Sequence, residues 1–163
     1  MTVEELQKLL EARSEDEHLE FKEAKGSYDF ESLVDYCVAL ANEGGGRFVL
    51  GVTNTPPRKI VGSKAFDVPE RTVAGIHERI HLKIVWHELV RPEGRVLVFE
   101  VPSRPQGQPV HYKGRYLMRV GEELVPMSPD QLKRIFDEGQ PDFIELPAKA
   151  DCGEPSSPIR GPA

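Results

Sequence analysis

The chain has 163 residues, of which 39% are hydrophobic and 29% are charged, and its formal net charge at pH 7 is −6. This composition predicts a soluble globular protein with its own core, and no apolar run reaches the length of a transmembrane helix. Cys37 and Cys152 are the only cysteines, so a disulfide framework is not expected. We therefore expect a cytoplasmic protein that does not associate with a membrane.

The charges are unevenly distributed along the chain. Residues 44–119 hold thirteen bases and six acids, whereas the segments on either side are acidic. The net negative charge argues against a uniformly basic nucleic-acid binder, but local fields rather than net charge attract a polyanion. The basic segment over residues 44–119 is therefore suited to contacts with phosphates. The alternative is that its charges are spread over a solvated surface and bind no ligand.

The first part of the chain predicts two helices and two strands. Thr2 and Glu5 have the spacing of a capping box at the start of a helix over residues 2–12. Residues 18–22 alternate between polar and apolar and predict a short strand. Residues 29–54 predict a helix, a glycine turn and a central strand, because apolar residues recur at helical spacing, then glycines, then a continuous apolar run. Such a unit places its two strands parallel and close together.

The second part predicts a further helix over residues 68–81 and then a hairpin. Its strands, 84–90 and 96–101, flank Arg91-Pro92-Glu93-Gly94, which is a strong turn signal. Ser128-Pro129 begins a last helix. Shorter strands are predicted at 59–61, 110–113, 115–120 and 124–127. The fold class that follows is α+β, a mixed β-sheet with a β-α-β crossover and flanking helices.

A change in composition predicts the domain boundary. From Gly139 onwards prolines are frequent and apolar residues no longer recur at a regular spacing. We therefore expect one domain over residues 1–138, followed by a proline-rich flexible tail or linker over residues 139–163.

Four motifs carry a resemblance to a known family. They are LEFK at 19–22, A-N-x-G-G-G-x-x-x-x-G-V at 41–52, IVG at 60–62 and YLMRVGEELVPMS at 116–128. In this order they resemble the Schlafen-type, Alba-like DNA-binding domain of bacterial divergent-AAA transcriptional regulators. The resemblance covers about residues 12–138. It implies a Schlafen/Alba-like fold and the binding of DNA or RNA.

The same resemblance raises an enzymatic alternative. Schlafen-type endoribonucleases use two glutamates and an aspartate to hold a divalent cation, which activates water and neutralises phosphate charge. Glu15 and Glu20 match the two glutamates, but Asn54 stands at the third position and contributes no charge. We therefore expect no cofactor and little or no cleavage. Cleavage of structured RNA with Mg²⁺ or Mn²⁺ is the alternative, and a third possibility is a protein-interaction or homo-oligomerisation module.

A zinc-protease pattern is also present but is disfavoured. His77-Glu78-Arg79-Ile80-His81, followed by His87, matches the H-E-x-x-H spacing. The residues that follow the second histidine predict a strand, which would carry His87 away from the other two. We therefore predict no metal site.

Basic residues with an aromatic neighbour are the candidate nucleic-acid contacts. Bases on strands and hairpins can contact phosphates, while a tyrosine can stack on an unpaired base. Arg115 and Arg119 lie on the same face of a predicted strand and can act together. The candidates are Lys22, Arg47, Arg58, Lys59, Tyr112, Lys113, Arg115 and Arg119.

Overall fold

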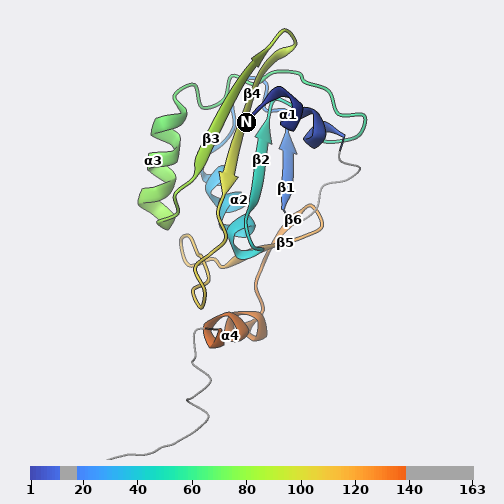
Figure 1. Cartoon of the computed structure of the whole chain (residues 1–163). Coiled ribbons are helices and arrows are strands. Elements are labelled where there is room, and N and C mark those ends of the chain that lie inside the picture. Colours follow the sequence, from blue (N-terminus) through green and yellow to red (C-terminus); the bar gives the residue numbers. More distant parts are fainter. Residues whose placement is uncertain (12–17, 139–163) are drawn as a thin grey trace, which may run out of the picture. The chain divides into compact units, whose positions relative to one another are not determined.

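A computed structural model describes residues 1–11 and 18–138 (Figure 1). The first part of the chain forms α1 (Val3–Leu10), β1 (Leu19–Lys22), α2 (Phe30–Asn42) and β2 (Gly46–Leu50). The second part forms α3 (Pro69–Ile80), β3 (Val85–Arg91), β4 (Gly94–Val101), β5 (Leu117–Val120), β6 (Glu123–Pro126) and α4 (Pro129–Asp137). These elements confirm the α+β class. In the described ranges, no helix combines the length and the apolar character that crossing a bilayer requires.

Two compact units divide the chain. Among the described residues, one comprises residues 1–11, 18–105 and 109–128, and the other comprises residues 106–108 and 129–138. In the second unit, Lys133 pairs with Asp137 at 2.8 Å, one turn further along α4. Residues 139–163, where the flexible tail is predicted, lie outside the described residues, so the boundary at residue 138 stays a prediction.

The first unit contains a four-stranded mixed sheet in the order β1-β2-β4-β3. β1 and β2 are parallel, with Glu20 beside Phe48, while β4 runs antiparallel to both β2 and β3. This arrangement confirms the predicted parallel neighbours, the central position of β2 and the turn between β3 and β4. The predicted strands at 59–61 and 110–113 are wrong. Each contributes only a single β-bridge, because positive φ at Gly62 and at Lys113 turns the chain away.

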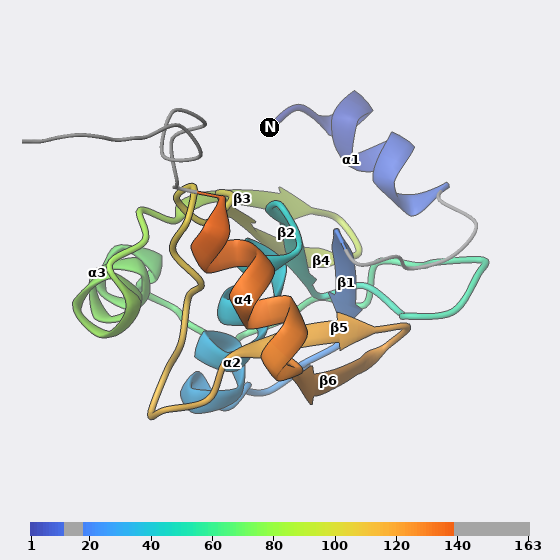
Figure 2. The same cartoon turned by 90° about the horizontal axis from the view of Figure 1, so that it is seen from below.

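Helices cover both faces of this sheet (Figure 2). On one face, α2 and α3 bury the largest core cluster, in which Leu33 and Ile76 lie with Phe48 and Phe99. On the other face, Leu6 of the short helix α1 joins a smaller cluster around Phe21. The inner strands β2 and β4 are therefore buried on both sides, as expected for a central β2, whereas the edge strand β3 stays partly exposed.

The glycine turn after α2 brings the chain back into the sheet. The Gly45 N–H donates to Leu40 O at 2.8 Å, which satisfies a carbonyl at the helix end. Gly44 and Gly45 have φ values of 102° and 98°, which other residues rarely adopt. A Cβ at Gly46 would lie 2.4 Å from His18 O, so a side chain there would push β2 away from β1.

Hydrogen bonds of the Asn42 side chain connect the end of α2 to the segment that leads into β5. Its buried amide donates to Val110 O at 2.9 Å and to Leu117 O at 2.8 Å, and it accepts from the Val110 N–H at 2.8 Å. Three backbone groups distant in sequence thus depend on one side chain, which gives the asparagine of the A-N motif a structural role.

We expect Asn42→Leu to lower the free energy of unfolding by about 2–3 kcal/mol, because it leaves these buried backbone groups without partners. Urea denaturation would measure the change. Asn54→Leu is the matched control, since Asn54 is exposed and its replacement should change stability by less than about 0.5 kcal/mol. Equal effects of the two substitutions would contradict the role assigned to Asn42.

Candidate functional site

Glu20 and Arg119 form a buried ion pair between β1 and β5. Glu20 Oε1 lies 2.7 Å from Arg119 Nη2, and the two side chains are 1% and 0% exposed. Arg119 Nη1 also donates to Leu19 O at 3.0 Å. Burial of two opposite charges is tolerated when they pair with each other, and here Arg119 adds a hydrogen bond to the backbone. Arg119 therefore has no surface to offer a phosphate, and Glu20 is held by cations in the interior.

Lys22 lies on the other side of the Glu20 carboxylate. Its Nζ is 3.3 Å from Glu20 Oε2 and 5.1 Å from the centroid of the Tyr36 ring. Partial burial lowers the pKa of Lys22, but the charge of Glu20 and the neighbouring Tyr36 outweigh it, so the pKa lies above its usual value. Burial also raises the pKa of the nearby Tyr28 to about 12. Lys22 is thus a charged partner of Glu20 rather than a separate cation.

Two of the three positions of the Schlafen-type nuclease site are described, and they do not lie together as a cation site. Asn54 is exposed in the turn beyond β2, whereas Glu20 lies beside Phe48 within the sheet. Glu15 lies outside the described residues. Two cations already neutralise Glu20, and a divalent cation prefers several carboxylate oxygens. Within the described residues, no group of three or more His, Cys, Asp or Glu side chains could hold a metal. Glu20 and Asn54, the two of these positions that the structure describes, do not by themselves fit Mg²⁺ or Mn²⁺.

The histidines of the H-E-x-x-H pattern lie apart from His87. His77 and His81 have ring centroids 6.3 Å apart at the end of α3. His87 lies on β3, where its Nε2 is 2.9 Å from Glu100 Oε2. The strand that was predicted after α3 is present, and it takes His87 into the sheet.

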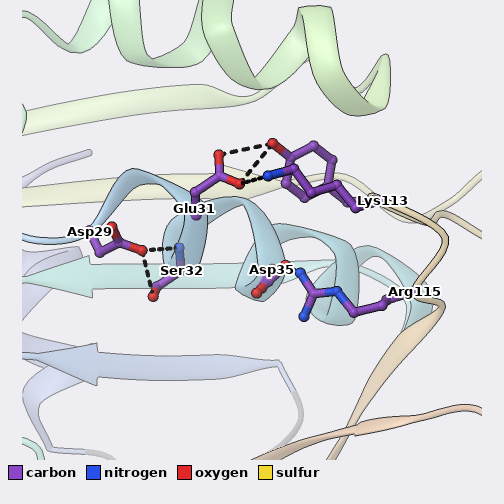
Figure 3. A network of polar contacts seen from close by, with 7 residues as sticks. Asp29, Glu31, Ser32, Asp35, Lys113 and Arg115 are labelled. Carbon is purple, nitrogen blue, oxygen red and sulfur yellow. Dashed lines mark hydrogen bonds and ion pairs between the residues drawn. The ribbon is translucent and has the colours of Figure 1, made fainter.

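The turn over residues 112–115 is held against α2 by ionic contacts (Figure 3). Lys113 Nζ lies 2.6 Å from Glu31 Oε1, and the Tyr112 hydroxyl donates to Glu31 Oε2 at 2.9 Å. Arg115 Nη2 lies 2.6 Å from Asp35 Oδ1. Three predicted nucleic-acid contacts therefore face acids of α2, which offset the positive charge of the turn.

These contacts predict an unusual titration of Glu31. The hydrogen bond from Lys113, followed by that from Tyr112, lowers the pKa of the Glu31 carboxyl. A carboxyl group whose pKa is lower in the folded state than in the unfolded state stabilises the fold at pH values above its unfolded-state pKa. This contribution to stability is lost as the pH falls through the folded-state pKa. We expect Lys113→Met to raise the Glu31 pKa towards its usual value, as followed by NMR of the carboxyl carbon. An unchanged titration midpoint of Glu31 would show that Lys113 is not the main cause of the lowered pKa.

The remaining predicted contacts lie on the α1 side of the sheet. Arg47 Nε is 3.7 Å from Glu100 Oε2, a partly exposed pair. Arg58 is 7% exposed, and its guanidinium lies 4.3 Å from the centroid of the Phe21 ring, where it packs as a cation–π contact. Lys59 is exposed. Of these three bases, Lys59 is therefore the most accessible to a phosphate.

Bases also meet at the edge of the sheet where three strands end. β1, β2 and β3 all run in one direction, so their carboxyl ends lie together, and this is where ligands often bind in open sheets. We call this edge the carboxyl-end surface and define it by Lys25, Lys59, Lys64 and Arg91. The first three are exposed, and Arg91 is partly so. The sequence did not indicate this group, because the four bases are far apart along the chain and come together only where the strands end.

Two hollows lie at this surface, one on each side of the turn between β3 and β4. The larger, of about 910 Å³, contains three glycines, and we call it the glycine hollow. The smaller has a volume of about 420 Å³ and includes Lys59 and Arg91. The glycine hollow is lined by Lys25, Gly26, Val61, Gly62, Ser63, Lys64, Asp67, Gly94 and Arg95.

Close backbone packing explains the glycines of two motifs. The Val61 and Gly62 N–H groups both donate to Gly51 O, at 2.8 and 3.0 Å. A Cβ at Gly51 would lie 2.5 Å from Arg95 O, and one at Gly94 would lie 2.5 Å from Gly62 Cα. Side chains at these positions would separate the segments, so Gly51 of the G-V motif holds in place the I-V-G segment, which lines the glycine hollow.

Comparison with known proteins agrees with this fold. The crystal structure of the DIP2311 protein from Corynebacterium diphtheriae is 19% identical, with a TM-score of 0.62 over 86% of this chain and 32% of that protein. This chain thus spans about a third of that protein's length. The solution NMR structure of the N-terminal domain of an ATP-dependent DNA helicase RecG-related protein from Nitrosomonas europaea is 20% identical. Its TM-score is 0.51, over 76% of this chain and 88% of that domain.

A family assignment follows from the sequence. No curated protein matches this chain. The profile of the Schlafen, AlbA_2 family, in contrast, matches residues 15–128, which include the sheet, α2, α3 and all four motifs. The match extends over most of the chain and confirms the resemblance drawn from the motifs. The protein is therefore a member of the Schlafen, AlbA_2 family.

Proposed function

We infer that this domain binds nucleic acid, and that phosphates contact the carboxyl-end surface. The observation that supports this proposal most directly is that bases from separate segments meet there: Lys25 after β1, Lys59 and Lys64 after β2, and Arg91 at the end of β3. Lysines on such a surface contact a phosphate backbone without reading its sequence.

Two of these bases, Lys59 and Lys64, are more available than the other candidates. In the described part of the chain, Lys59 and Lys64 have no ion pair with a carboxylate, whereas Lys113 and Arg115 pair with acids of α2. A base that is already paired must give up its partner before it gains a phosphate, so Lys59 and Lys64 can contribute more to binding. The helicase-related protein that shares this fold supports a connection with nucleic acid.

Fluorescence anisotropy with DNA and RNA oligonucleotides at several salt concentrations tests the proposal. Affinity should fall steeply as salt rises. We expect the double variant Lys59→Ala with Lys64→Ala to weaken binding to all sequences alike and to reduce the slope of log affinity against log salt by about 1–2. Lys83→Ala is the matched control, because Lys83 is exposed just before β3, at the opposite end of that strand.

Two other outcomes would favour the alternative functions. Cleavage of structured RNA with Mg²⁺ or Mn²⁺ that Asn54→Ala abolishes would favour the endoribonuclease. Undetectable binding at low salt, together with self-association in light scattering, would favour an interaction or homo-oligomerisation module.

A further inference from the structure

The glycine hollow has the size and the fixed walls of a ligand site. Its volume of about 910 Å³ lies within the range of small-molecule pockets. Hydrogen bonds tie its walls together: the Lys64 N–H donates to Lys25 O at 2.9 Å, and the Ser63 hydroxyl donates to Ala24 O at 2.6 Å. The segment after β1 and the segment after β2 are thus fastened to each other.

Arg95 holds the same wall from the side of the hairpin. Its Nη1 donates to Ala65 O at 2.7 Å and its Nη2 donates to Phe66 O at 2.8 Å, while its Nε pairs with Glu88. Arg95 therefore positions the backbone and has little capacity left for a ligand. A site with walls that are already in place loses less entropy on binding.

The lining combines uncharged backbone with a positive rim. Gly62 and Gly94 pack backbone on backbone and add no side chains to the lining. Lys25 and Lys64 are exposed lining residues, and Asp67 is the one acid among the lining residues, although Lys25 also lies 3.9 Å from Glu23. A wall without side chains leaves room for a planar ring, and two ammonium groups suit a phosphate. These two features together suit a nucleotide.

We propose that the glycine hollow binds one unstacked nucleotide of a single strand, with the phosphate at Lys25 and Lys64 and the base over Gly62 and Gly94. The proposal rests on the proposed function and adds a preference to it, since a base can enter the hollow only after it leaves a duplex stack. A single strand should therefore bind more tightly than a duplex of the same length.

Backbone-amide NMR with AMP as the probe tests the site directly. Shifts should appear in residues 61–64 and 94–95, and inorganic phosphate or adenosine alone should produce only part of them. Gly26→Trp should remove these shifts. It adds bulk to the lining, and a Cβ at Gly26 meets no atom within 4 Å, so the backbone there has room for a side chain. No shifts with AMP at millimolar concentration, or equal shifts with phosphate alone, would overturn the proposal.

Oligonucleotide binding then separates this inference from the proposed function. We expect Gly26→Trp to weaken single-strand binding roughly tenfold, on the order of the loss of one base contact, and to leave duplex binding unchanged. Unchanged single-strand affinity in Gly26→Trp, with salt-sensitive binding intact, would overturn the nucleotide site alone. AMP shifts at the glycine hollow without any oligonucleotide binding would uphold the site and contradict the proposed function.

Discussion

Arg119→Met is expected to lower the free energy of unfolding by about 3–5 kcal/mol, because it leaves the Glu20 carboxylate buried without its nearest partner. The Glu20 side chain is 1% exposed, so water cannot replace the guanidinium. Leu19 O also loses the donor that Arg119 Nη1 provides. A loss of this size is a large part of the stability of a small domain, and urea denaturation would show a much lower midpoint.

A double-mutant cycle separates the ion pair from ordinary loss of packing. Glu20→Gln together with Arg119→Met removes both buried charges, so we expect the double variant to be more stable than Arg119→Met alone. Additive losses from the two single substitutions would show that the pair does not act as a unit. The same cycle also bears on function. A strong energetic coupling between Glu20 and Arg119 would support a structural role for Glu20 rather than a catalytic one.

Gly51→Ala is the second substitution with a large expected effect. The φ of Gly51 is 96°, and an added Cβ would lie 2.5 Å from Arg95 O and 3.1 Å from Ser63 N. Strain in the backbone and overlap with two other segments should together lower the free energy of unfolding by about 3 kcal/mol or more. Thermal and urea denaturation both measure the change.

Gly26→Ala provides the matched control for this prediction. Gly26 lines the glycine hollow, and a Cβ there meets no atom within 4 Å and its φ lies outside the strained range. Its replacement should leave stability within about 0.5 kcal/mol, or raise it slightly by restricting the unfolded chain. Similar losses from both substitutions would contradict the close backbone packing at Gly51.

Local patterns were sufficient to predict most of the secondary structure. The Asp29 side chain accepts from the Ser32 N–H at 2.9 Å, and the glycines end α2 as expected, because caps and turns depend on neighbouring residues. The parallel pairing of β1 with β2 followed from the strand-helix-strand order of this part of the chain. Such features need no knowledge of contacts that are distant in sequence.

The candidate site was predicted less well, because its side chains depend on distant partners. Alternation placed Glu20 and Phe21 on opposite faces of β1, but nothing nearby in sequence indicates that Arg119 covers Glu20. The acids that face Lys113 and Arg115 lie on α2, about eighty positions earlier. The glycine hollow forms only when three separate segments meet, so no single motif describes it.

The Glu20–Arg119 pair also bears on the order in which the chain can fold. β1, α2 and β2 are neighbours in sequence and can associate early, whereas β5 leaves the ribosome long after them. Until β5 docks, Glu20 keeps Lys22 but lacks the guanidinium, and Asn42 lacks two carbonyls and one N–H. A nascent chain that stops before β5 should therefore remain loosely packed around α2, and the docking of β5 should complete the core.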